Sequence, residues 1–257
     1  MQIKRLFWAG LAVTVGETTL LVDPLTKLSD LIGRMGAPGE PVYTIGSGAA
    51  QFALLTHQHA DHYHPNTLRE CLSGDGKVVC HQPLAQKVVQ DGFSVMAVER
   101  EVPSMLNEFQ VTAVPAVDGF GDDQVSWVIE GNGKRVIHCG DTLWHGYWWR
   151  IQQQYGPFDL AFLPMNGVLM PDPGAILQRP DLHFTDSSVP ASMTPEQAVA
   201  AGIVLGAKAV CPIHYGLDVP LYREYPQAPQ CFATCAQNRG LSVLWLQPGE
   251  EVRWEQV

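Results

Sequence analysis

The spacing of apolar residues in the first part of the chain predicts strands rather than helices. Residues 3–15 alternate loosely between apolar and polar positions, and residues 18–22 form an apolar, β-branched run. Pro24 closes the second of these two predicted strands, because proline cannot donate to the hydrogen-bonded ladder of a sheet. Residues 52–55 predict a further short, buried strand.

The rest of the chain predicts strands that alternate with short helices. We predict helices from Pro65 to Leu72, from Pro83 to Gln90 and from Pro195 to Gly206, because proline suits the first position of a helix. The predicted strands lie at residues 77–80, 94–98, 109–114, 125–130, 135–138, 160–163 and 209–213. No break in composition divides the chain, so we predict a single α/β domain over residues 1–257.

Two long segments, residues 25–49 and 164–190, are rich in glycine and proline. Their apolar residues follow neither the two-residue repeat of a strand nor the roughly 3.6-residue repeat of a helix. Loops of this length often serve as lids or binding loops. An ordinary surface loop without such a role is equally compatible with the sequence, so both alternatives stay open.

Composition narrows the class of protein. The 257 residues are 46% hydrophobic and 16% charged, which is typical of a globular protein. A net charge of −10 disfavours nucleic acid and anionic membranes as partners, because both bind basic surfaces. No apolar run reaches the roughly 20 residues that span a bilayer.

The N-terminal residues and the cysteines indicate the cellular compartment in which the protein resides. The first residues lack the pattern of a secretory signal, and the 6 cysteines form no CxxC pair, which is typical of reduced thiols in a cytoplasmic protein. We therefore expect a cytoplasmic protein with a small-molecule partner. A homo-oligomer is compatible with these observations.

Four side chains of metal-binding type follow the predicted strand at 52–55: His57, His59, Asp61 and His62. In an extended chain, side chains two positions apart point the same way, so His57 and His59 can share one cation. Asp61 and His62 are neighbours at a bend and can turn toward a second cation. Imidazole suits Zn²⁺, and a carboxylate extends the choice to harder ions such as Mn²⁺. A polar strand end could explain one histidine, but this cluster predicts a metal site.

The Thr-His-x-His-x-Asp-His motif of residues 56–62 resembles the signature of the metallo-β-lactamase superfamily. The resemblance implies a four-layer αββα sandwich with a metal site at one rim. It also implies that Asp141, in Gly-Asp-Thr, bridges two metals and that His214, in Cys-Pro-Ile-His-Tyr-Gly, is the last ligand. A surface turn for Asp141 and a core histidine for His214 are the alternatives.

One expected ligand is missing. Before Asp141 the superfamily normally supplies another histidine, often in a Pro-Ala-x-His context, but here Asp118 follows Pro-Ala-Val. A carboxylate can complete a divalent-metal site, so we predict Asp118 as a ligand, with Asp122 and Asp123 as the other candidates. Alternatively, Asp118 faces away and one metal position is weak or empty.

The segment Pro-Met-Asn-Gly at residues 164–167 is similar to a Pro-Ile-Asn-Gly stretch of the ascorbate-6-phosphate lactonase branch. This resemblance implies a small ester-like substrate: a lactone first, phosphorylated or not, and a phosphodiester second. Asn166 is then a candidate for substrate binding. A departure from the branch lies near Trp8, where many relatives carry a histidine.

Two further histidines could contact the substrate or transfer a proton. His145 lies four residues after Asp141, and His183 lies in the second long segment. A surface histidine is the ordinary explanation for both. We take His145 as a candidate catalytic residue and His183 as a candidate for substrate binding.

The motifs together predict a metal-dependent hydrolase with two divalent cations, Zn²⁺ first and Mn²⁺ second. The predicted ligands are His57, His59 and Asp118 for one ion, Asp61, His62 and His214 for the other, and Asp141 as the bridge. Cations about 3.5–4 Å apart make hydroxide available at neutral pH, and Asp61 could also take up or return the proton. The alternative function is a metal-binding or ligand-sensing module with degraded chemistry, and it rests on the missing histidine at position 118.

Overall fold

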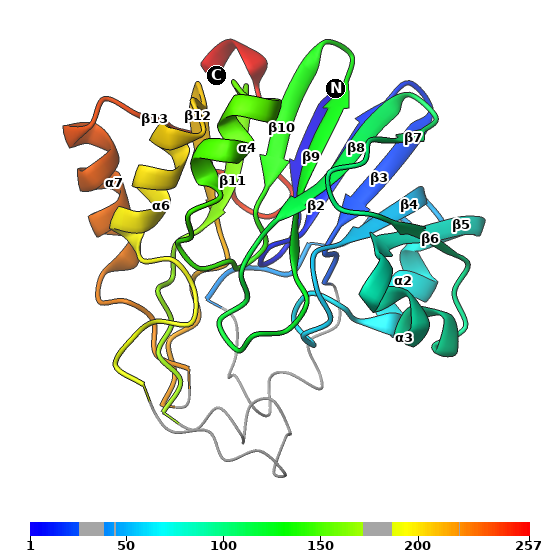
Figure 1. Ribbon diagram of the computed structural model, residues 1–257, viewed down its shortest axis with the longest axis horizontal. Coiled ribbons are helices and arrows are strands. Elements are labelled where there is room, and N and C mark those ends of the chain that lie inside the picture. Colours follow the sequence, from blue (N-terminus) through cyan, green and yellow to red (C-terminus); the bar gives the residue numbers. More distant parts are fainter. Residues whose placement is uncertain (26–38, 44, 172–186, 221) are drawn as a thin grey trace.

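Two β-sheets that lie face to face form the centre of the protein (Figure 1). The computed structural model describes residues 1–25, 39–43, 45–171, 187–220 and 222–257. The first sheet keeps its strands in chain order: β1 (Gln2–Arg5), β2 (Leu11–Val15), β3 (Thr18–Val22), β4 (Ala50–Leu55), β5 (Leu72–His81) and β6 (Val95–Val98). The second sheet has the spatial order β13 (Ser242–Val243), β12 (Ala209–Ile213), β11 (Leu160–Pro164), β10 (Lys134–His138), β9 (Val125–Gly131), β8 (Phe109–Pro115) and β7 (Ser104–Leu106).

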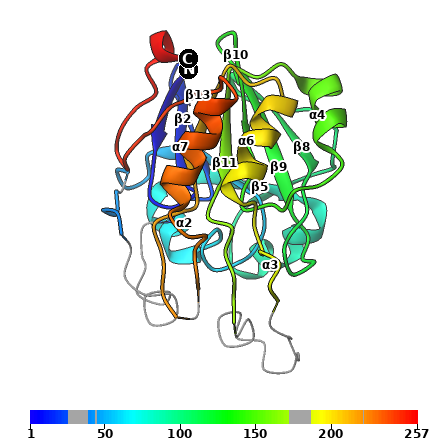
Figure 2. The ribbon, with the colours of Figure 1, turned by 90° about the vertical axis from the view of Figure 1, so that its left-hand side faces the viewer.

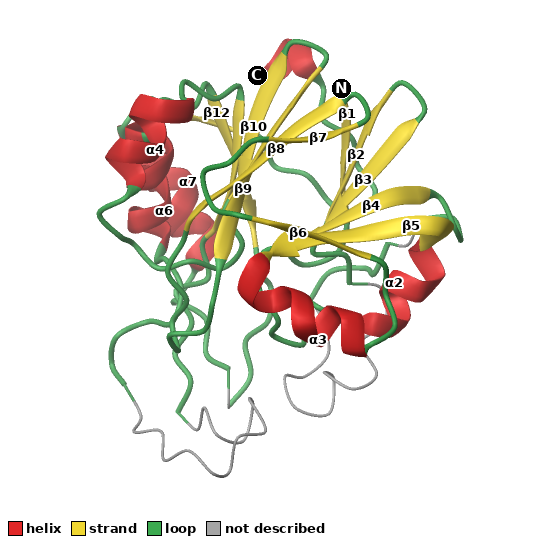
Figure 3. Cartoon of the chain, turned by 45° about the vertical axis from the view of Figure 1, so that its right-hand side comes forward, coloured by secondary structure: helices red, strands yellow, loops and turns green. Residues whose placement is uncertain are grey.

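Helices cover the outer face of each sheet. The first sheet carries α2 (Pro65–Cys71) and α3 (Ala85–Gln90), and the second carries α4 (Trp148–Tyr155), α6 (Pro195–Val204) and α7 (Ala228–Asn238) (Figures 2 and 3). Two 3₁₀ turns, η1 (Gln82–Leu84) and η2 (Trp254–Gln256), complete the described elements. The layers therefore run helix, sheet, sheet, helix, and the predicted αββα sandwich is confirmed. None of the helices in the described part of the chain has the length and apolar character that a membrane crossing requires.

The main core lies between the sheets because their facing sides are apolar. Leu54 and Val79 of the first sheet belong to the same buried cluster as Ile129 and Phe162 of the second. Strands β11 and β12 are buried at every position, because one side faces the other sheet and the other side faces helices. Both sheets thus share one core.

The segment predicted as one strand over residues 3–15 is two strands joined by a turn. The N–H of Leu6 donates to the carbonyl of Gly10 at 2.8 Å and closes this turn. Trp8 within it has φ +61°, in the left-handed region. The prediction was wrong here because the apolar pattern continues through the turn, whose side chains are buried as well.

The glycine-rich stretch before residue 77 is a bulge inside β5 rather than a turn before it. The pairing of β4 with β5 jumps from Ala50 opposite Leu72 to Phe52 opposite Lys77, so the intervening residues bulge out. Strands β7 and β13 and helices α4 and α7 were not predicted. Much of the two long loops, including His183, lies outside the described residues.

The carboxyl ends of several parallel strands meet at one rim of the sandwich. Strands β3 and β4 are parallel, as are β10, β11 and β12, and β8 shares the direction of β10 because both are antiparallel to β9. The side chains that follow these strand ends are Asp23 after β3, His57 after β4, Asp118 after β8, Asp141 after β10 and His214 after β12. This rim is where open α/β sheets commonly bind ligands.

Candidate metal centre

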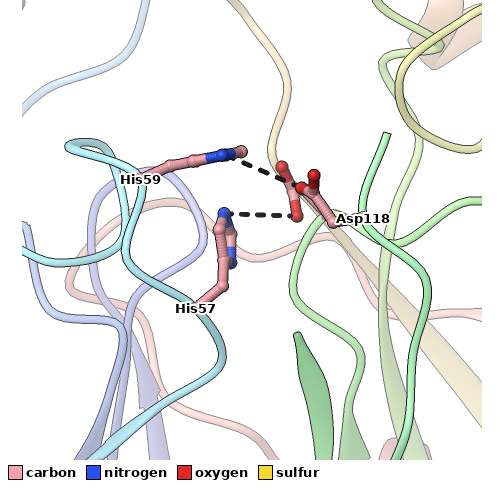
Figure 4. Close-up of side chains that lie close together, drawn as sticks. His57, His59 and Asp118 are labelled. Atoms are coloured by element: carbon pink, nitrogen blue, oxygen red, sulfur yellow. Dashed lines mark ion pairs between the residues drawn. The ribbon is translucent and has the colours of Figure 1, made fainter. Parts of the chain in front are cut away.

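The first ligand group joins the loop after β4 to the loops after β8 and β10. It comprises His57, His59, Asp118 and Asp141, each of which offers one ligand atom within 4.8 Å of the others. His57 Nε2 lies 3.6 Å from Asp141 Oδ1, and His59 Nδ1 lies 3.7 Å from Asp118 Oδ2. In Figure 4, His57 and His59 project from one loop toward the facing loops, and a dashed line joins His59 to Asp118. Asp118 therefore faces the histidines rather than away from them.

The second ligand group comprises Asp61, His62 and His214. Asp61 Oδ2 lies 3.7 Å from His62 Nε2 and 3.3 Å from His214 Nε2. Asp141 Oδ2 lies 3.9 Å from His62 Nε2 and 4.0 Å from His214 Nε2. One oxygen of Asp141 thus approaches each group, which is the arrangement that a bridging carboxylate needs.

Three buried ligand atoms have no hydrogen-bond partner among the described residues: His57 Nε2, His62 Nε2 and Asp118 Oδ2. Leaving such an atom unpaired costs about 1–3 kcal/mol. Imidazole nitrogen and carboxylate oxygen are ligands of Zn²⁺ and Mn²⁺. The residues of the rim therefore fit a pair of divalent cations.

Asp23 and Thr56, which the sequence analysis missed, orient two of the histidines. Thr56 donates its N–H to Asp23 Oδ1 at 2.9 Å and its hydroxyl to Asp23 Oδ2 at 2.6 Å. His62 Nδ1 lies 2.8 Å from Asp23 Oδ2, and His57 Nδ1 lies 3.0 Å from Thr56 Oγ1. Asp23 Oδ2 and Thr56 Oγ1 both act as acceptors here, so the ring proton of each histidine lies on Nδ1. In a neutral ring, Nε2 then keeps its lone pair for a metal. The only signal in the sequence was the Asp-Pro pair that ends a strand.

Two further side chains hold the carboxylates of the rim. Gln124 Nε2 donates to Asp141 Oδ1 at 2.7 Å, and Trp8 Nε1 donates to Asp61 Oδ2 at 3.0 Å. The centroid of the Trp8 ring lies 4.2 Å from that of His214. Trp8 and His214 have φ values of +61° and +56°, which are uncommon for residues other than glycine. Such conformations cluster at functional sites.

The charges of the rim interact strongly. Burial opposes ionisation of Asp61 and Asp141, but the surrounding histidines outweigh it and hold the pKa of both carboxyls well below the usual range. Burial lowers the pKa of His57 to about 3. Burial also opposes protonation of His59 and His62, but neighbouring carboxylates raise their pKa values to about 9 and about 10. In the metal-free protein, His59 and His62 are therefore protonated at neutral pH.

Metal uptake at pH 7 is expected to release protons from His59 and His62. A metal cannot bind a protonated imidazole nitrogen, so the apparent affinity should rise with pH until it levels off near the pKa values of about 9 and 10. Titration calorimetry with Zn²⁺ in buffers of different ionisation enthalpy measures the protons released. His59→Gln should reduce that number, and uptake with no proton release at pH 7 would contradict the prediction.

The other predicted site residues have different surroundings. Asp122 Oδ2 lies 3.0 Å from His59 Nε2, so Asp122 contacts this ligand although it does not belong to the ligand group. Asp123 is exposed. His145 is stacked on Trp148 with ring centroids 4.1 Å apart. The side chain of Asn166 is buried, where Nδ2 donates to Tyr222 Oη at 2.9 Å and Oδ1 accepts from Ser192 Oγ at 2.5 Å. The catalytic and substrate-binding roles of these residues stay predictions.

Comparison with known proteins agrees with this fold. Residues 18–215 match the family described as the beta-lactamase superfamily domain. A metal-dependent hydrolase of Thermococcus onnurineus is 26% identical over 243 residues, covering 92% of each chain. A metal-dependent hydrolase of Thermus thermophilus is 27% identical over 263 residues, covering 98% of this chain and 99% of that protein. The solved structure of Igni18, a metallo hydrolase from Ignicoccus hospitalis, has a TM-score of 0.68 at 20% identity and covers 98% of this chain and 97% of its own. The family match spans well over half of the chain, which therefore belongs to the beta-lactamase superfamily and has the metallo-β-lactamase fold.

Proposed function

We propose that this protein is a metal-dependent hydrolase that holds two adjacent divalent cations, Zn²⁺ first and Mn²⁺ second. One observation carries the proposal: the two oxygens of Asp141 approach two separate ligand groups. Three buried ligand atoms of these groups have no hydrogen-bond partner among the described residues. The relatives named as metal-dependent hydrolases support it. The predicted cytoplasmic location and homo-oligomeric state stay predictions.

Each ligand group has a distinct part in this mechanism. His57, His59 and Asp118 would hold one cation, Asp61, His62 and His214 the other, and Asp141 both. When bound, such a pair lowers the pKa of a shared water and polarises the carbonyl or phosphoryl oxygen of the substrate. Asp23 and Thr56 keep the histidine lone pairs directed at the site.

Asp61 is the proposed proton-transfer residue, and His145 is the proposed hydrogen-bond donor to the leaving group. Asp61 carries a carboxylate at the rim, where Trp8 holds one of its oxygens, and can take up and return a proton. Burial lowers the pKa of His145 to about 4, so its ring is neutral at pH 7. His145 Nδ1 accepts the N–H of Tyr147 at 3.3 Å, which places the ring proton on Nε2. In this state His145 would donate a hydrogen bond from Nε2 to the developing charge on a leaving-group oxygen.

The proposed substrate is a small ester-like molecule, with a lactone first and a phosphodiester second. The resemblance of residues 164–167 to the ascorbate-6-phosphate lactonase branch supports this choice. Because Asn166 donates to Tyr222 Oη, and the Tyr222 ring lies 6.1 Å from that of Trp8, Asn166 would shape the substrate pocket by fixing Tyr222.

The decisive experiment concerns Asp118. We expect two equivalents of bound metal in the wild type, about one in Asp118→Ala and two in Asp118→His, because histidine restores a ligand. Asp75→Ala, which changes an exposed carboxylate outside the ligand groups, is the matched control and should keep both metals. Metal content is measured by elemental analysis, and turnover with panels of lactones, phosphorylated lactones and phosphodiesters.

The outcomes separate the two candidate functions. Unchanged metal content in Asp118→Ala would remove Asp118 from the ligand set. A wild type with neither metal nor turnover would instead favour the metal-binding or ligand-sensing module. The aspartate at position 118, in place of the histidine that the superfamily normally supplies, is the observation that keeps this second function in view.

A further inference from the structure

A third group of metal-ligand side chains lies away from the rim, on the outer helical layer. It comprises Glu196 of α6 and Cys231 and Cys235 of α7, with one ligand atom of each within 4.8 Å of the others. Figure 2 shows α6 and α7 side by side. The two cysteines are four residues apart on a helix, so they share one face. Two thiols and a carboxylate from neighbouring helices thus converge.

Hydrogen bonds already join these side chains. The Cys231 thiol donates to Glu196 Oε1 at 3.0 Å, and Tyr225 Oη donates to the same oxygen at 3.1 Å. Burial and the hydrogen bond to Glu196 raise the pKa of the Cys231 thiol to about 12. Burial would raise the pKa of Glu196, but the Cys231 thiol and the backbone N–H at the start of α6 outweigh it and lower that pKa. At neutral pH the metal-free group is a carboxylate that accepts a hydrogen bond from a thiol.

The spacing fits a tetrahedral metal better than a disulfide. Zinc–sulfur and zinc–oxygen bonds of about 2.3 and 2.1 Å place tetrahedral ligand atoms about 3.6–3.8 Å apart, and the three atoms here already lie within 4.8 Å of one another. A disulfide needs Cβ atoms about 3.5–4.5 Å apart. Positions four apart on a helix hold their Cβ atoms about 5–6 Å apart, so Cys231 and Cys235 do not form a disulfide without distorting α7.

The group is accessible and chemically distinct from the rim. Glu196 is exposed and both cysteines are partly exposed, so a cation and a coordinating water can reach them. Thiolates select soft or borderline ions such as Zn²⁺, whereas the rim groups contain only histidine and aspartate.

We propose that Glu196, Cys231 and Cys235 form a separate site for a thiophilic divalent cation such as Zn²⁺, with water as the fourth ligand. On binding, the two thiols lose their protons to solvent and the cation takes the place of the hydrogen bond between Cys231 and Glu196. The bound ion links the start of α6 to α7 and stabilises their packing. This site is independent of the proposed hydrolysis, because it shares no residue with the rim.

The test is titration of the full-length, reduced protein with Co²⁺, a spectroscopic substitute for Zn²⁺. Thiolate-to-cobalt charge-transfer absorption reports this site, since the rim groups hold no sulfur and the four other cysteines are buried and belong to no ligand group among the described residues. We expect the final intensity to correspond to one thiolate-bound Co²⁺ per chain, in addition to Co²⁺ that binds at the rim, and we expect the absorption to disappear when Zn²⁺ is added. Cys231→Ser and Cys235→Ser should abolish it, and Glu196→Gln should weaken Co²⁺ binding at least about tenfold.

Two controls separate this site from the rim and from nonspecific effects. Asp141→Asn alters the rim and should leave the charge-transfer absorption unchanged. Glu99→Gln changes an exposed glutamate elsewhere and should do the same. Absence of the absorption in the reduced wild type, or its persistence in both cysteine variants with intact helical circular dichroism, would overturn the proposal.

Discussion

Replacing Asp141 by asparagine is expected to strip the rim of metal and abolish turnover. Asp141 is the one carboxylate in the described part of the chain that approaches both ligand groups, with Oδ1 3.6 Å from His57 Nε2 and Oδ2 3.9 Å from His62 Nε2. Removing its charge leaves cations close together without their shared anionic ligand. Loss of an outer-shell partner alone costs about 10–100-fold in metal affinity or activity. We therefore expect losses of more than about a hundredfold in both.

The fold should survive this substitution, which makes the result interpretable. Asparagine keeps an oxygen that can accept the hydrogen bond from Gln124, and its shape is nearly that of aspartate. Elemental analysis, turnover and circular dichroism are measured together. Asp75→Asn makes the same change of charge at an exposed position outside the ligand groups and should behave as the wild type. An Asp141→Asn variant with two equivalents of tightly bound metal would disprove the bridging role.

Replacing Asp23 by alanine is expected to destabilise the metal-free protein by about 3–5 kcal/mol. The fully buried carboxylate of Asp23 accepts from the Thr56 N–H and hydroxyl and pairs with His62, so alanine would leave all three groups without their partner. Asp23 also has φ +40°, a conformation that aspartate and asparagine tolerate better than alanine does. Urea unfolding of the metal-free protein measures the loss.

Asp23→Asn is the matched comparison. Asparagine keeps an acceptor for the Thr56 N–H and tolerates the positive φ. Its amide NH₂ group, however, takes the place of the oxygen that accepts from the Thr56 hydroxyl and from His62, so three donors meet without an acceptor. We expect a smaller loss of stability than with alanine, together with a 10–100-fold loss of zinc affinity because His62 is no longer oriented. If Asp23→Ala unfolds within about 0.5 kcal/mol of the wild type, Asp23 has no such supporting role.

The candidate ligands were predicted from the ends of strands together with the resemblance to the metallo-β-lactamase superfamily. An apolar run that stops at a polar residue is a local pattern, and it locates the segment 57–62, Asp141 and His214. Asp118 was predicted from that resemblance, because it follows Pro-Ala where the superfamily normally supplies a histidine. The structure brings all of these side chains into two groups at one rim.

Elements without a clear local pattern were not predictable. Helix α7 has Pro229 in its first turn, but its N-cap residue, Gln227, is left-handed and makes no side-chain hydrogen bond to the helix, so this single signal was overlooked. Without that helix, Cys231 and Cys235 are merely two cysteines that fit no CxxC motif. Strand β13 has only the residues Ser242–Val243 and gains its strand character from pairing with β12.

The sequence by itself determined the kinds of ligand, their order along the chain and the sandwich that carries them. Only the tertiary structure decided which side chains support them: Asp23 beneath His62, Trp8 against Asp61 and Gln124 against Asp141. The same holds for the thiol group, where Glu196 and Cys231 are 35 positions apart. Hydrogen bonds and metal coordination act over about 2–3 Å, and such distances between loops and helices arise only when the sheets and their covering layers pack together.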